Sequence, residues 1–108
     1  MSPLAQKVFE FMMSRGYIGK ENPVTSREFA HNITELRVMR VKNVAYELYR
    51  VKNELLENDI AILGGDSGRY IAESAGEIIE AAERLENEAQ ARKDTANKLR
   101  NIAKMRLQ

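Results

Sequence analysis

Cysteine is absent from the 108 residues of the chain. Its absence excludes disulfide frameworks, thiol catalysis and cysteine-based zinc sites, and it is compatible with a reducing compartment. Histidine occurs once, as His31, which cannot form a metal cluster alone. Long apolar runs are missing too, since none approaches the roughly 18 residues of a membrane span. With no export signal visible either, we expect a cytoplasmic protein.

Charge of either sign is almost balanced, and the formal net charge is only +1. A near-neutral chain argues against a protein that coats nucleic acid by charge alone. Between residues 37 and 52, however, five basic residues accompany a single acid, Glu47. The five are Arg37, Arg40, Lys42, Arg50 and Lys52. This local excess is either a nucleic-acid contact or a mixed solvated helix face, which is the usual origin of charge runs.

Groupings of catalytic residues are also missing. The acids Glu54, Glu57 and Asp59 stand near no nucleophile or histidine and lack metal-ligand spacing. No cofactor motif is visible, and the Gly-rich stretch at residues 64–68 lacks the lysine of a P-loop. We therefore expect neither an enzyme nor a bound cofactor or metal.

Two helix starts are marked near the N-terminus. Ser2 followed by Pro3 is a hydroxyl cap with proline at the first helical position, and Gly16 ends that helix. Thr25 and Glu28 form a capping box for a second helix, which runs to about residue 33. Val24 and Phe29 are predicted to close across this box as a hydrophobic staple. The core residues expected from both helices are Leu4, Val8, Phe11, Met12, Phe29, Ala30 and Ile33.

A longer helix is predicted over residues 36–58. Its apolar residues recur at steps of three and four and predict a core face of Val41, Val44, Leu48, Val51 and Leu55. The opposite face carries Lys42, Asn43, Tyr46, Arg50 and Asn53. In a continuous helix Met39 would project beside Tyr46, so the helix either begins later or is bent. A β-hairpin follows, with strands at 60–63 and 69–72 and a glycine-rich turn at 64–68.

The remaining chain, residues 74–108, predicts one long helix that opens with a capping box at Ser74 and Glu77. With Ile78 as heptad position d, the d residues are Ile78, Leu85, Arg92, Leu99 and Arg106, and the a residues are Ala82, Ala89, Ala96 and Ala103. Alanines in register favour close helix approach, whereas arginines at d argue against a dry parallel zipper. The alternative is that alanine is simply common in exposed helices. We predict a homodimer or higher homo-oligomer through Ile78, Ala82, Leu85, Ala89, Ala96, Leu99 and Ala103.

The order of these elements in residues 1–73, mainly α with a small β-hairpin, resembles the winged helix-turn-helix family. The resemblance is carried by residues 24–30 (Val-Thr-Ser-Arg-Glu-Phe-Ala), by residues 49–60 and by the Gly-Tyr-containing stretch at 65–74. The chain is similar to small bacteriophage and bacterial winged-helix proteins, in which a further helix often follows. One departure is a linker between the second and third helices that is longer than the usual short turn.

The resemblance implies that the third helix enters the major groove of double-stranded DNA and that the hairpin tip lies along the neighbouring backbone or minor groove. On that basis Asn43, Tyr46 and Arg50 are placed for base edges, and Arg27, Arg40, Lys42 and Arg69 for phosphates. Tyr46 has the alternative role of a surface aromatic packed on the hairpin. The expected function is that of a phage or bacterial transcription regulator acting as a dimer. Alternatives are an adaptor or inhibitor with a protein partner, and a DNA-recognition subunit in phage replication or packaging.

Overall fold

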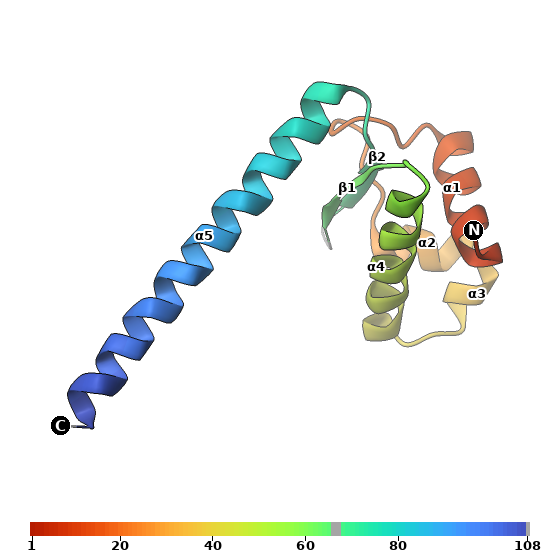
Figure 1. Cartoon of the computed structure of the whole chain (residues 1–108). Helices are drawn as coiled ribbons and strands as arrows, with labels where there is room; N and C mark the ends of the chain where they lie inside the picture. Colours follow the sequence, from red (N-terminus) through yellow and green to blue (C-terminus); the bar gives the residue numbers. More distant parts are fainter. Residues whose placement is uncertain (66–67, 108) are drawn as a thin grey trace. The chain divides into compact units, whose positions relative to one another are not determined.

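The computed structural model describes residues 1–65 and 68–107, and it divides into two units, Met1–Ile78 and Ile79–Gln108. The chain is mainly helical with one two-stranded antiparallel hairpin, which confirms the predicted fold class at that level (Figure 1). The elements are α1 (Pro3–Arg15), α2 (Ser26–Asn32), α3 (Thr34–Arg37), α4 (Val41–Glu57), β1 (Ile62–Gly65), β2 (Gly68–Ile71) and α5 (Ala75–Arg106).

Both predicted caps of α1 are confirmed. The Ser2 hydroxyl accepts a hydrogen bond from the Ala5 amide at 3.2 Å, and Pro3 occupies the first turn. Gly16 closes the helix in the left-handed region at φ 72°, where glycine carries no Cβ penalty. Two predicted core residues of α1, Val8 and Met12, are buried together with Ala5.

The capping box of α2 is confirmed in full. The Thr25 hydroxyl accepts from the Glu28 amide at 3.2 Å, and the Glu28 carboxylate accepts from the Thr25 amide at 3.2 Å. The Glu28 carboxylate also accepts from the Thr25 hydroxyl at 3.1 Å. The two hydrogen bonds that it accepts from the Thr25 amide and hydroxyl hold the pKa of Glu28 below its ordinary value, and the Tyr17 hydroxyl, 3.1 Å away, adds to the effect. Both predicted staple residues, Val24 and Phe29, are fully buried.

Replacing Glu28 with glutamine is expected to destabilise the protein near neutral pH and to matter less in acid. The pKa of Glu28 is lower in the folded chain than in the unfolded one. The carboxylate therefore contributes stability above its ordinary pKa, and the contribution is lost as pH falls through the folded pKa. Chemical denaturation from about pH 7 to about pH 3 should show the gap between wild type and Glu28→Gln closing. The exposed loop residue Glu21, changed to glutamine, controls for loss of charge; a gap that widened in acid would contradict the expectation.

The predicted helix over residues 36–58 is two helices. α3 ends at Arg37, and α4 starts at Val41 after Arg40, whose backbone is extended at φ −68° and ψ 151°. The later start resolves the conflict over Met39, which packs against the core ahead of α4. The prediction that Val41 is a core residue is wrong, because its side chain is 84% exposed at the first position of α4. The other four predicted core residues of this helix are buried: Val44, Leu48, Val51 and Leu55.

The hairpin begins two residues later than predicted and pairs Ile62 with Ile71 and Gly65 with Gly68. The predicted turn residues Asp66 and Ser67 lie outside the described residues. β2 is also bonded along its other edge, to the loop between α1 and α2, which the sequence did not predict. There Val24 and Arg69 exchange both backbone hydrogen bonds, at 2.7 and 2.9 Å. This loop therefore fixes the hairpin to the helices.

One hydrophobic core joins these elements of the first unit. The Phe11 ring packs against both Phe29 and Tyr17, with centroids 5.6 Å apart in each case. The buried apolar residues are Ala5, Val8, Met12, Val24, Phe29, Ile33, Leu36, Val44, Leu48, Val51, Leu55 and Ile62. Packing against this core holds α4 along its length.

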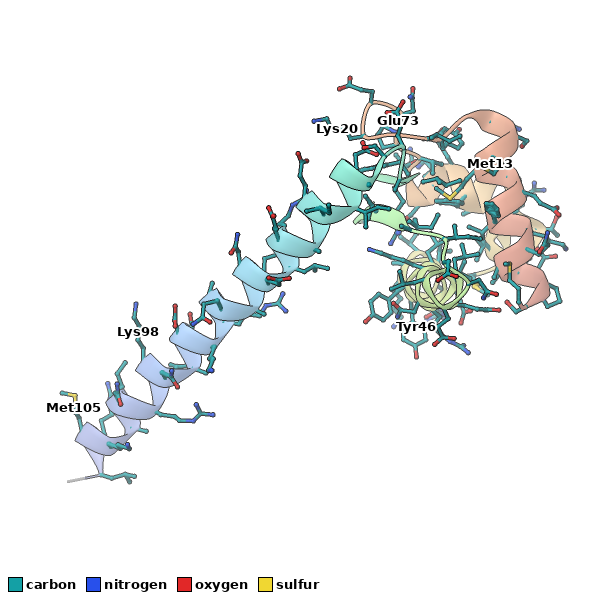
Figure 2. All side chains as sticks on the ribbon, turned by 45° about the horizontal axis from the view of Figure 1, so that its top comes forward. Met13, Lys20, Tyr46, Glu73, Lys98 and Met105 are labelled. Carbon is teal, nitrogen blue, oxygen red and sulfur yellow. The ribbon has the colours of Figure 1, made fainter. Side chains whose placement is uncertain are left out.

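The start of α5 is tied to the loop after α1. The Ser74 hydroxyl accepts from the Glu77 amide at 3.3 Å, as the predicted cap requires. The Glu77 carboxylate accepts from the amides of Glu73, at 2.6 Å, and Lys20, at 3.0 Å, and these bonds lower the pKa of Glu77. Figure 2 shows Lys20 and Glu73 close together at this point. Among residues 1–65 and 68–107, no helix combines the length and the apolar character needed to cross a bilayer.

Candidate nucleic-acid interface

The outer face of α4 is the side opposite its buried residues, and it carries the residues Lys42, Asn43, Tyr46, Tyr49, Arg50 and Asn53, all of them exposed. At 100° per residue, this face is centred about half a turn from the core stripe. Four of the predicted DNA-binding residues are thus brought together on one helix surface. Because the other side of α4 is packed in the core, these side chains start from a rigid backbone.

Two tyrosines dominate the middle of the outer face. Tyr46 is 62% exposed and Tyr49 is 60% exposed, and Figure 2 shows Tyr46 projecting outward from α4. Most of the Tyr46 ring is therefore open and not covered by the hairpin. Tyr49 was missed by the sequence analysis because it lies toward the edge of the polar face. Exposed tyrosine rings suit stacking or hydrogen bonding to a partner.

The N-terminal end of α4 is the basic end of this surface. Exposed Arg40 lies at the N-cap and exposed Lys42 at the second position of the helix. Within the described residues, no side chain caps this end. Uncapped amides and the positive end of the helix dipole favour an anion, and the two cations reinforce that preference. Arg27 is exposed on a different element, α2.

One of the two flanks of α4, between the outer face and the buried stripe, is acidic. Glu54 accepts hydrogen bonds from the amide and the hydroxyl of Ser2, and these lower its pKa. Glu47 accepts from Arg50 at 3.3 Å, in a contact with side chains 24% and 64% exposed. Such an exposed pair contributes at most about 1 kcal/mol, so Arg50 can exchange it for another acceptor. With Glu35 and Glu57, these acids line an open groove of about 650 Å³. A polyanion is repelled along this flank.

The other flank of α4 faces the hairpin through Lys52. Its Nζ donates to the Gly64 carbonyl at 3.3 Å. Burial lowers the pKa of Lys52, and the nearby charge of Arg69 adds to the effect. The sequence analysis placed Lys52 only in the basic run. Its position joins α4 to β1 and orients the hairpin beside the outer face.

Arg69 differs most from its predicted role. It is only 5% exposed, and its Nη1 donates to the Ser26 hydroxyl at 2.9 Å. Its backbone is paired with Val24. A guanidinium buried between β2 and the start of α2 is not positioned as a phosphate contact would be. We assign it to holding the hairpin against α2.

The chain gives no match to any family model, curated protein or solved structure. A role for the outer face of α4 is therefore argued from its own geometry and charge. Among the described residues, no group of three or more histidines and acids is arranged to hold a metal ion. His31, the one histidine, is exposed on α2.

Proposed function

We propose that this protein binds double-stranded DNA sequence-specifically, with α4 as the recognition helix of a winged helix-turn-helix and the hairpin as its wing. The observation that carries the proposal is the outer face of α4, where hydrogen-bonding side chains and two tyrosines project from a helix anchored in the core. A B-form major groove, about 12 Å wide, admits one α-helix. The isolated bridge between Val24 and Arg69 gives the hairpin the rigidity that a wing needs.

Each part of the surface has a separate role in this proposal. Asn43, Tyr46 and Arg50 contact base edges, because Asn pairs naturally with adenine and Arg with guanine. Arg40 and Lys42 contact phosphates at the uncapped start of α4, and Arg27 does so from α2. The acidic flank directs the DNA toward the hairpin side. Arg69 is left out of the contacts because it is buried.

The biological role that fits this proposal is a bacterial or phage regulator that works in the cytoplasm, without catalysis, as a dimer held by α5. A dimer doubles the contacts and requires paired half-sites. A DNA-recognition subunit in phage replication or packaging would bind DNA in the same way. The number of chains bound per DNA site distinguishes this role from that of a regulator.

Arg50→Ala is expected to weaken binding to a selected site about 5- to 150-fold more than binding to random duplex. A bidentate arginine to guanine contact discriminates by roughly 1 to 3 kcal/mol, whereas non-specific binding depends on the total phosphate contacts. Fluorescence anisotropy on both DNAs, at several salt concentrations, measures the two losses. Binding by wild type should weaken steeply with salt.

Arg84→Ala is the matched control, because it removes the same charge from an exposed position of α5 outside the predicted seam. It should leave both affinities nearly unchanged. Equal losses for Arg50→Ala on selected and random DNA would remove the base-reading role. No binding by wild type even at low salt would overturn the proposal as a whole.

A protein partner is the second candidate, and exposed apolar side chains next to the outer face favour it. Val38 and Val41 are each 84% exposed, and Leu56 is 60% exposed. Apolar groups of this size at the ends of a helix suit a protein surface better than a phosphate backbone. This alternative predicts negligible DNA affinity at physiological salt, together with a stable complex whose formation is blocked by Tyr46→Ala.

A further inference from the structure

The long helix α5 is divided by charge into two halves. Residues 75–90 contain five glutamates and one arginine, whereas residues 91–107 contain six basic residues and one aspartate. The helix dipole favours this polarity only within the first and last turns. Glu86 and Glu88 lie near the middle of α5, so the dipole does not explain their sign.

The same helix exposes large apolar side chains that have no covering partner within their own unit. On the seam, Ile78 is 45% exposed, Leu85 is 65% exposed and Leu99 is 62% exposed. α5 buries none of its described residues. It is continuous from Ala75 to Arg106, so a hairpin of α5 on itself is excluded in the structure. α5 alone therefore cannot cover its apolar seam.

Antiparallel registers that differ by one heptad all place the alanines of position a against the long side chains of position d. If Ala82 faces Leu99 of the partner subunit, Ala96 faces Leu85 of the partner subunit. Ala103 then faces Ile78 of the partner subunit, and Ala89 faces Arg92 of the partner subunit. Each layer pairs an alanine with a long side chain, which permits close packing without a cavity. The two-fold axis of this register passes between Gln90 and Ala91.

The charges distinguish this register from those shifted by one heptad. The boundary between the acidic and basic halves falls at residues 90 and 91, on the two-fold axis. An antiparallel pair therefore lays each acidic half on a basic half, and Glu86 at position e faces Lys93 of the partner subunit. A parallel pair would instead align glutamates with glutamates and Arg92 with itself, and like charges in contact are destabilising.

We infer that α5 binds α5 of a second copy of this chain in an antiparallel pair centred between residues 90 and 91. The inference gives the orientation of the dimer in the proposed function. It rests on that function only for the biological role of the dimer. The Ile78 positions of the two copies are then about 37 Å apart along the pair, at 1.5 Å per residue.

Single cysteines introduced into the cysteine-free full chain test the orientation directly. Ala82→Cys and Leu99→Cys proteins, mixed and oxidised, should give a covalent heterodimer. Each variant oxidised alone should give almost none, because its two thiols lie about 25 Å apart in the antiparallel pair. Disulfides require Cα atoms within about 7 Å, so this difference is decisive. Light scattering on wild type should give twice the mass of one chain.

Asn87→Cys mixed with Asp94→Cys is the matched control. These residues lie at the same level of the pair in this register, but both point outward, away from the partner helix, so their cross-linking measures chance collision. Efficient cross-linking of Ala82→Cys with itself would show a parallel pair and overturn the inference. A monomeric mass for wild type would overturn it as well. Neither measurement involves DNA, so loss of the dimer is distinguishable from loss of DNA binding.

Discussion

Phe29→Ala is expected to lower the free energy of unfolding by about 3 to 5 kcal/mol. Phe29 is fully buried in α2, and its ring packs against Phe11 with centroids 5.6 Å apart. Removing it leaves a cavity where α1, α2 and α4 meet, because the residues around it belong to three helices that cannot all move inward. Urea denaturation followed by circular dichroism measures the change. A domain of this size has only about 5 to 15 kcal/mol to lose.

Phe9→Ala is the control for this substitution. Phe9 has the same side chain on α1 but is only partly buried against the core. Its replacement removes less buried area and leaves space that water can fill, so the loss should be clearly smaller. Similar losses for both variants would mean that Phe29 does not occupy the centre of the core.

The features that the sequence predicted correctly are local ones. The caps at Ser2, Thr25 and Ser74 depend on side chains that reach backbone amides three residues away. The buried stripe of α4 follows from helical periodicity alone, as does the exposure of Lys42, Asn43, Tyr46 and Arg50. Such signals are complete within a short stretch of chain. They can be recognised without knowing which elements pack against that stretch in the fold.

The features that the sequence analysis missed depend on contacts between distant segments. Val41 continues the apolar spacing of α4, but the chain turns into α4 at Arg40, and Met39 packs on the core before that turn. Periodicity cannot show where tertiary packing ends a helix. Similarly, nothing near Val24 reveals that its backbone pairs with Arg69, 45 positions later.

The candidate site divides in the same way. The exposed donors of α4 could be predicted because one helix carries them. The role of Arg69 could not be predicted, because its burial depends on Ser26 and on the bridge to Val24. From the sequence, a charged residue next to a glycine-rich turn is expected to be exposed. Only the packing of β2 against α2 shows that Arg69 is buried. This burial fixes the hairpin beside α4, which is the arrangement that the DNA-binding proposal needs.

Gly64→Ala is expected to open the hairpin and to cost roughly 2 kcal/mol or more, from the backbone strain together with the contact that it creates. Gly64 lies in β1 at φ 88°, where a side chain is strained. A Cβ at this position would also be 2.2 Å from the Gly68 carbonyl oxygen. Because that atom is backbone, β2 must move to relieve the contact. Hydrogen exchange should become faster at the Tyr70 amide, which lies opposite Leu63, and at the Ala72 amide, which donates to the Ala61 carbonyl at 2.9 Å.

Gly65→Ala gives the matched comparison, one residue along the same strand. Among the described atoms, its Cβ would meet nothing within 4 Å, so the substitution should change stability by less than Gly64→Ala does. Gly64 also presents the carbonyl to which Lys52 donates, so opening β1 should detach the hairpin from α4. If the wing contacts DNA, Gly64→Ala will lower affinity and the salt dependence together, whereas Gly65→Ala will leave both close to wild type. Equal effects of the two alanines would contradict a hairpin held in register by Gly64.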